Sequence, residues 1–185
     1  MKIRTPRLIL VAGTPELTGS ELADRAAFFA LLGVPAPDLW PPEENDETTM
    51  RYFLDGVSRG SEQAGWWCWY VLFSAPDGPR LAGSAGFKGP PSASGEVEIG
   101  YSILPSWRNR GIAKEAVAGL CRWAESDPRI SRIVAETLPH LDWSIRVLRA
   151  CGFEGPLSGS EDGVIRFLRP RPSRTGTDPA HSGRG

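Results

Sequence analysis

Residues 96–116 of the chain read EVEIGYSILPSWRNRGIAKEA, and this stretch decides the fold. Polar and apolar residues alternate up to Leu104, which predicts a strand, and Pro105 ends it. A short turn rich in arginine follows. After the turn, apolar residues recur at helical spacing and predict a helix over 110–125. The stretch therefore predicts a strand, a turn and a helix in direct succession.

The turn between this strand and this helix carries the pattern Arg-x-x-Gly-x-Ala at 108–113. N–H groups in the first turn of a helix have no partner within the helix, and together with the helix dipole they attract anions. Gly111 has no side chain that would keep a phosphate from the main chain. Arg108 and Arg110 add positive charge and forked hydrogen-bond donors. The turn is therefore a predicted pyrophosphate site.

The composition is that of an ordinary globular protein, with 41% hydrophobic and 23% charged residues in 185. This length favours one domain. The net charge of −1 gives no sign of a nucleic-acid partner. No apolar run approaches the roughly 20 residues that span a bilayer, and the first residues lack the apolar core of a signal peptide. We therefore expect no nucleic acid and no membrane among the partners.

The cysteines and histidines give no sign of a metal site. Cys68, Cys121 and Cys151 are widely spaced and lie among apolar residues, which predicts buried free thiols in a reducing cytoplasm. No pair of them has the spacing of metal ligands, and the two histidines are far apart. We expect a cytoplasmic protein without a metal.

Outside 96–125, the hydrophobic pattern predicts strands and helices in turn along the chain. We expect strands over 7–12, 66–73, 80–88, 130–138 and 164–169, another that begins at Phe153, and helices over 16–32, 47–58 and 143–151. Residues 170–185 contain almost nothing apolar and predict a disordered tail. The prediction is a single α/β domain over 1–169, with one mixed central sheet of six to seven strands and helices on both faces.

Together these features resemble the Gcn5-related N-acetyltransferases, the GNAT family, whose acyl-CoA signature is Arg/Gln-x-x-Gly-x-Gly/Ala between a strand and a helix. Within the family the chain is similar to the branch of RimJ/RimL-like N-terminal acetyltransferases of ribosomal proteins. The likeness runs from about residue 3 to residue 169. Besides the turn, three segments carry it: 5–10, 81–87 and 144–153.

The resemblance implies a fold in which the fourth and fifth strands splay apart and acetyl-CoA lies between them. Main-chain groups of 102–104 would pair with the pantetheine arm, and one N–H would stabilise the oxyanion. The cofactor-binding residues expected on this basis are Ser102, Ile103, Leu104, Arg108, Asn109, Arg110, Gly111, Ile112 and Ala113.

The resemblance also supplies candidates for proton transfer. Glu98 is the candidate general base, because it would flank the thioester and burial there would raise the pKa of its carboxyl towards useful basicity. Glu96 points to the same face of the strand and is the alternative base, or a solvated charge at the acceptor site. Ser144 matches the serine of the branch pattern Asn-x-x-Ser and is the candidate acid. All three also fit structural roles, and a base acting through water, or no dedicated base or acid, stays open.

Leu141 departs from the family pattern. Relatives usually carry an asparagine there that hydrogen-bonds the cofactor arm, so cofactor affinity or acyl preference is expected to differ. For the acceptor, Trp40 and Trp67 are candidate walls of the pocket, or else packing residues of the core. The acidic run at 43–47 either attracts a cationic amine or stabilises a helix N-terminus.

The chain is thus expected to be a monomeric or homodimeric enzyme that transfers acetyl from acetyl-CoA to a primary amine. The acceptor would be a protein N-terminus or a small molecule, attacking directly in a ternary complex. The alternative is a non-catalytic acyl-CoA-binding or regulatory domain, which Leu141 and the absence of a tyrosine from the last helix favour. A dinucleotide-binding fold is excluded, because no G-x-G-x-x-G follows the first strand.

Overall fold

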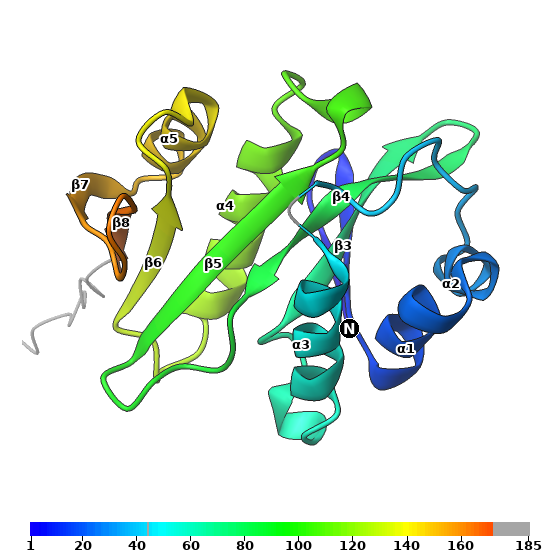
Figure 1. Ribbon diagram of the computed structural model, residues 1–185, viewed down its shortest axis with the longest axis horizontal. Coiled ribbons are helices and arrows are strands. Elements are labelled where there is room, and N and C mark those ends of the chain that lie inside the picture. Colours follow the sequence, from blue (N-terminus) through cyan, green and yellow to red (C-terminus); the bar gives the residue numbers. More distant parts are fainter. Residues whose placement is uncertain (44, 172–185) are drawn as a thin grey trace, which may run out of the picture.

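The computed structural model describes residues 1–43 and 45–171. Within them, eight strands form one sheet in the order β1-β2-β3-β4-β5-β6-β8-β7 (Figure 1). The strands are β1 Lys2–Arg4, β2 Leu8–Ala12, β3 Cys68–Ala75, β4 Gly78–Phe87, β5 Glu96–Ile103, β6 Arg132–Thr137, β7 Glu154–Ser158 and β8 Ile165–Pro170. The α-helices are α1 Pro15–Ala23, α2 Arg25–Leu32, α3 Glu47–Val57, α4 Ile112–Glu125 and α5 Asp142–Ala150.

The centre of the sheet opens between β5 and β6. These two strands are parallel and pair only over Glu96–Glu98 with Arg132–Val134. Beyond Glu98, β5 continues beside β4 through Ile99–Ile103, whereas β6 continues beside β8. The two strands therefore diverge towards their carboxyl ends, and α5 lies beside the open end (Figure 1).

Helix α4 covers one face of the sheet, against β2, β4 and β5. Of the apolar stripe that the sequence predicts, Ala116, Val117, Leu120 and Ala124 are buried, and Ala113 is half-buried. Helices α1, α2 and α3 lie on the opposite face (Figure 1). Trp69 and Tyr70 show how β3 serves both faces, since consecutive side chains of a strand point to opposite sides. Trp69 packs in the α4 core, whereas Tyr70 packs in the α1–α2 core.

The core under α1 and α2 contains a buried carboxylate. Glu21 is 5% exposed and accepts hydrogen bonds from Trp40 Nε1 at 2.9 Å and from Tyr70 Oη at 2.6 Å. Burial raises the pKa of Glu21, and the two hydrogen bonds only partly oppose that rise. Through Trp40, this carboxylate holds the segment between α2 and α3 against the sheet.

Glu21 predicts a pH dependence of stability. Because its pKa is higher in the folded chain than in the unfolded chain, its contribution is fully present below the unfolded pKa and is lost as the pH rises through the folded pKa. In urea unfolding series from about pH 8 to about pH 5, the wild type should gain free energy of unfolding relative to Glu21→Gln as the pH falls. A constant difference across the series would mean that Glu21 does not titrate in this range.

Three details of the predicted fold differ from the structure. Strand β1 raises the strand count above the expected six to seven by pairing antiparallel with β2. The helix expected over 16–32 is two helices, because Asp24 leaves helical geometry and its carboxylate caps α2 at the N–H groups of Ala26 and Ala27. The order extends past 169: Pro170 ends β8, and Arg171 donates to the carbonyl of Glu125 at 3.0 Å. The rest of the predicted tail, 172–185, lies outside the described residues.

Candidate active site

The predicted phosphate turn has the geometry of an anion site. Asn109 and Gly111 both adopt left-handed backbone conformations, with φ of 60° and 75°. Helix α4 begins directly afterwards at Ile112, and no side chain caps its first turn. Its first N–H groups therefore remain available to a ligand, and the positive end of the helix dipole lies behind them. Ile112 itself is buried, so only its main chain can serve this site.

Arg108, the first residue of the motif, is engaged on both sides in this structure. Its Nε donates to the carbonyl of Ile103 at 3.0 Å, and its Nη2 meets the Glu43 carboxylate at 3.0 Å. Both side chains are exposed, so this ion pair contributes little free energy. Arg108 can therefore release Glu43 and bind another anion. Arg110 lies over the ring of Trp107 at 5.2 Å from its centre. The turn therefore carries two arginines whose present partners are exchangeable or apolar.

The sequence did not predict that a third arginine lies at this turn. Arg7, which precedes β2, donates from Nη1 to the carbonyl of Arg110 at 3.0 Å and pairs with Glu115 at 2.7 Å. A Cβ on Gly111 would lie 3.3 Å from Arg7 Nη2. Burial alone would raise the pKa of Glu115, but hydrogen bonds from Thr5 and Arg7 outweigh it and lower that pKa. Glu115 therefore stays ionised and holds the Arg7 guanidinium beside the turn.

The main-chain groups that β5 presents to the gap differ from those expected. Leu104 N donates to Ala82 on β4, and Lys88 N donates to the Glu98 carbonyl. In an antiparallel pair, every second residue directs both of its main-chain groups to the same neighbour. Ser102 and Leu104 therefore face β4, and the main-chain groups of Tyr101 and Ile103 face the gap. Of the three residues expected to pair with a pantetheine arm, the backbone geometry suits only Ile103.

Glu98 and Glu96 are both ion-paired, with different partners. Glu98 contacts Lys88 Nζ and is 21% exposed. Glu96 pairs with Arg132 at 2.6 Å and more distantly with Arg166 at 3.6 Å. Two arginines thus hold Glu96 as a structural charge, whereas Glu98 faces one half-exposed lysine beside the point where β5 leaves β6.

Ser144 lies in the first turn of α5, where Tyr101 reaches it across the gap. The two hydroxyl oxygens are 3.0 Å apart, and Tyr101 Oη also lies 3.2 Å from the Ser144 carbonyl. Burial raises the pKa of Tyr101 to about 12, so its hydroxyl stays protonated at neutral pH. Tyr101 on β5 thus places a phenol hydroxyl beside the first turn of α5. Leu141 occupies the cap position of α5, and no side chain caps the first turn of this helix.

The two tryptophans predicted to line an acceptor pocket are buried. Trp40 is 8% exposed and stacks on Phe28 with ring centres 5.7 Å apart. Trp67 is 3% exposed and packs edge-on against Tyr52 at 5.3 Å. These contacts give both rings a packing role in the core. Tyr52, which packs against Trp67, is 45% exposed.

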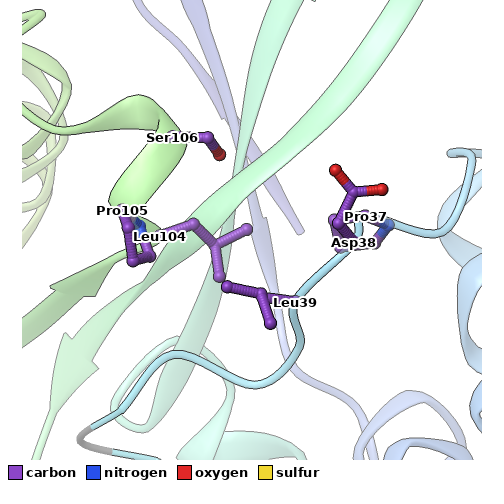
Figure 2. A pocket seen from close by; sticks show the side chains of 6 residues that line it. All are labelled: Pro37, Asp38, Leu39, Leu104, Pro105 and Ser106. Carbon is purple, nitrogen blue, oxygen red and sulfur yellow. The ribbon is translucent and has the colours of Figure 1, made fainter.

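Two hollows flank the site. A cavity of about 90 Å³ lies between the α2–α3 segment and the end of β5. It is lined by Pro37, Asp38, Leu39, Leu104, Pro105 and Ser106 (Figure 2). An open depression of about 240 Å³ lies at the carboxyl end of β6, lined by Lys88, Glu136, Thr137, Leu138, Ser160, Glu161 and Val164. Lys88 links this depression to Glu98. Among residues 1–43 and 45–171, no group of three His, Cys, Asp or Glu side chains could hold a metal ion.

A phosphate turn, a strand pair that diverges beside a carboxylate and a hydroxyl pair across the gap all lie along β5 and the segment that follows it. A family model described as an acetyltransferase (GNAT) domain matches residues 16–154, well over half of the chain. The chain belongs to the GNAT acetyltransferase family. None of the helices in the described part of this family member is long and apolar enough to cross a membrane.

Individual GNAT relatives are similar to the chain over part of its length. It is 30% identical to the uncharacterized N-acetyltransferase YjdG of Bacillus subtilis (strain 168), over 66% of this chain and 71% of that protein. It is 32% identical to the [ribosomal protein uS5]-alanine N-acetyltransferase of Escherichia coli (strain K12), over 46% of this chain and 44% of that enzyme. The latter match spans less than half of either protein.

Solved structures share the GNAT fold along nearly the whole chain. RimL, a ribosomal L7/L12 alpha-N-protein acetyltransferase in complex with coenzyme A, superposes with a TM-score of 0.65 and 19% identity, over 92% of this chain and 98% of that one. An acetyltransferase (GNAT family) from Bacillus anthracis gives a TM-score of 0.60 and 17% identity, over 92% and 99%. At these identities the likeness shows the fold alone.

Proposed function

We propose that the chain is an N-acetyltransferase that transfers acetyl from acetyl-CoA to a primary amine, by direct attack in a ternary complex. One observation carries this proposal: β5 leaves β6 directly after Glu98 and continues past the Tyr101–Ser144 hydroxyl pair towards the anion site at 108–113. RimL, which has the same fold, was solved in complex with coenzyme A, and this supports acetyl-CoA as the acetyl donor. The acceptor is a protein N-terminus or a small-molecule amine.

Each part of the site has a task in this reaction. Arg7, Arg108 and Arg110 with the first N–H groups of α4 bind the pyrophosphate, because they combine fixed charge with oriented donors. A main-chain N–H of Tyr101 or Ile103 faces the gap and stabilises the oxyanion. Glu98 accepts the proton of the attacking amine. Ser144 donates a proton to the leaving sulfur.

Tyr101 positions Ser144 for that step. When the protonated Tyr101 donates to Ser144 Oγ, the serine's own proton is free to point at the sulfur. We expect Tyr101→Phe to lower kcat about tenfold, less than the roughly 10²–10⁴-fold effect of a general acid because Tyr101 acts only through Ser144, and to leave the KM for acetyl-CoA nearly unchanged. Steady-state kinetics of Tyr101→Phe, Ser144→Ala and the double variant measure the coupling. If the two losses simply multiply, Tyr101 does not act through Ser144.

The acceptor amine approaches the site through the 240 Å³ depression at the carboxyl end of β6. Glu136 and Glu161 line it together with Lys88. Burial would raise the pKa of Glu136, but hydrogen bonds from Ser160 and Arg166 outweigh it and lower the pKa, so Glu136 is ionised and pairs with Arg166. Glu161 adds a second carboxylate to the lining. Carboxylates attract cationic amines. We place the protein in the cytoplasm, since its three cysteines are buried free thiols.

The experiment that tests the function measures release of free coenzyme A thiol from acetyl-CoA. The panel contains peptides with different N-terminal residues and, separately, small primary amines. Release with one class establishes the enzyme and its acceptor type. Binding of acetyl-CoA by calorimetry without release for any acceptor would instead support the non-catalytic acyl-CoA-binding domain, which the substitution of Leu141 for the family asparagine favours.

A further inference from the structure

Lys88 is held in front of Glu98 by contacts on both sides of its main chain. Its N–H donates to the carbonyl of Glu98 at 2.9 Å, and its carbonyl accepts from Tyr52 Oη at 2.8 Å. Its Nζ forms the ion pair with Glu98. The side chain is 58% exposed, and it also lines the 240 Å³ depression. The ammonium group of Lys88 therefore lies against the candidate base, at the edge of the 240 Å³ depression.

An ion pair of this kind is easily broken and re-formed. Paired charges at the surface contribute little free energy, so Lys88 spends time away from Glu98 and an acceptor amine can take its place. When no acceptor is present, the amine nearest to the base is that of Lys88. A reacting group held in place gains a large effective concentration over amines in solution.

We propose that Lys88 is a self-acetylation site of this protein, modified by the chain's own acetyltransferase centre. The proposal rests on the proposed function. Glu98 takes one proton from the Lys88 ammonium and passes it to solvent, and the neutral amine attacks the carbonyl carbon of the acyl-CoA thioester. The N–C bond forms and the C–S bond breaks. The second amine proton ends on the departing sulfur, so the products are an amide and a free thiol.

The modification changes the acceptor site. The acetylated side chain carries no charge, so its ion pair with Glu98 is lost. The added acetyl group occupies part of the depression that Lys88 lines. Self-acetylation therefore competes with acceptor acetylation and alters the site on which both depend.

The sequence provides its own controls for a test. Its three lysines are Lys2, Lys88 and Lys114, so two other amines report purely chemical acetylation in the same sample. The purified chain is incubated with acetyl-CoA that carries an isotope-labelled acetyl group, without any acceptor. It is then digested with a protease that does not cut at lysine, and the label at each lysine is followed by mass spectrometry.

We expect label at Lys88 to appear at least about tenfold faster than at Lys2 and Lys114, because general-base catalysis and positioning act on Lys88 alone. The fractional rate should not depend on protein concentration, since the step is intramolecular. Glu98→Gln and Gly111→Glu should each reduce labelling of Lys88 to the level of the two controls and leave the controls unchanged. Lys88→Arg identifies the labelled peptide by its loss.

The outcomes separate this proposal from the proposed function. If the acceptor panel is acetylated while Lys88 labels no faster than the controls, self-acetylation is wrong and the function stands. If calorimetry shows no binding of acetyl-CoA, both are wrong. If Lys88 labels fast in all variants, or faster at higher protein concentration, the intramolecular reaction at this centre is wrong.

A second measurement needs no acetyl-CoA. With nitrogen-15-labelled lysine, NMR resolves the three side-chain ammonium groups of the chain. The signal of Lys88 should exchange with water more slowly than those of Lys2 and Lys114, and Glu98→Gln should shift it alone, because a charge-assisted hydrogen bond to the carboxylate protects it. If the three lysine signals exchange with water equally fast and none of them shifts in Glu98→Gln, the ion pair between Lys88 and Glu98 is absent in solution and the proposal is wrong.

Discussion

Replacement of Gly111 by glutamate is expected to abolish measurable acetyl-CoA binding, with a loss of at least about 100-fold in affinity, or about 2.7 kcal/mol. Gly111 adopts φ of 75°, a left-handed conformation that costs other residues roughly 1–2 kcal/mol. A Cβ there would lie 3.3 Å from Arg7 Nη2. The new carboxylate would therefore enter the anion site, compete for its arginines and repel the phosphates.

Two matched variants separate charge from geometry in this prediction. Gly111→Gln has the bulk of glutamate without the charge, and Gly111→Ala has the backbone strain with little bulk. Calorimetric titration with acetyl-CoA should rank the losses Glu, Gln, Ala from largest to smallest, while thermal unfolding verifies that each variant is folded. Wild-type affinity in Gly111→Glu would show that the turn at 108–113 does not bind the pyrophosphate.

What the sequence predicted correctly is mostly local along the chain. The strand, turn and helix over 96–125 follow from alternation, one proline and an apolar stripe, and the structure has β5, the turn and α4 in that order. The break at Asp24 was missed although its signal is also local: an aspartate two and three residues before the alanines whose N–H groups it caps. Helical periodicity alone does not reveal such a break, because the apolar spacing continues through it.

The parts of the site that escaped prediction are contacts between distant segments. Arg7 reaches the phosphate turn from 103 positions away, and Tyr101 meets Ser144 across 43 positions. Nothing near these residues in the sequence indicates their partners. Similarly, the dense aromatic strand gives no sign that Trp67 is turned inward under α3, because a tryptophan suits a buried face and a pocket wall equally well.

Glu98→Gln is expected to lower kcat for amine acetylation about 100-fold, within the range for loss of a general base and equal to about 2.7 kcal/mol of transition-state stabilisation. Glutamine has the size of glutamate but cannot accept the amine proton. The affinity for acetyl-CoA should stay at the wild-type value, since the anion site at 108–113 lies at the other end of the gap. Stopped assays of turnover at saturating acceptor and calorimetry with acetyl-CoA measure the two effects separately.

Lys88 makes a matched control necessary for this variant. Glu98→Gln removes the partner of Lys88, and the unpaired ammonium then repels a cationic acceptor, which raises the acceptor KM without any change in chemistry. In the double variant Glu98→Gln with Lys88→Gln, both charges are absent, so the KM should return towards the wild-type value. If Glu98 is the base, the loss in kcat remains in the double variant. If kcat recovers together with KM, Glu98 acts only as the counter-ion of Lys88, and a water-mediated route must deprotonate the amine.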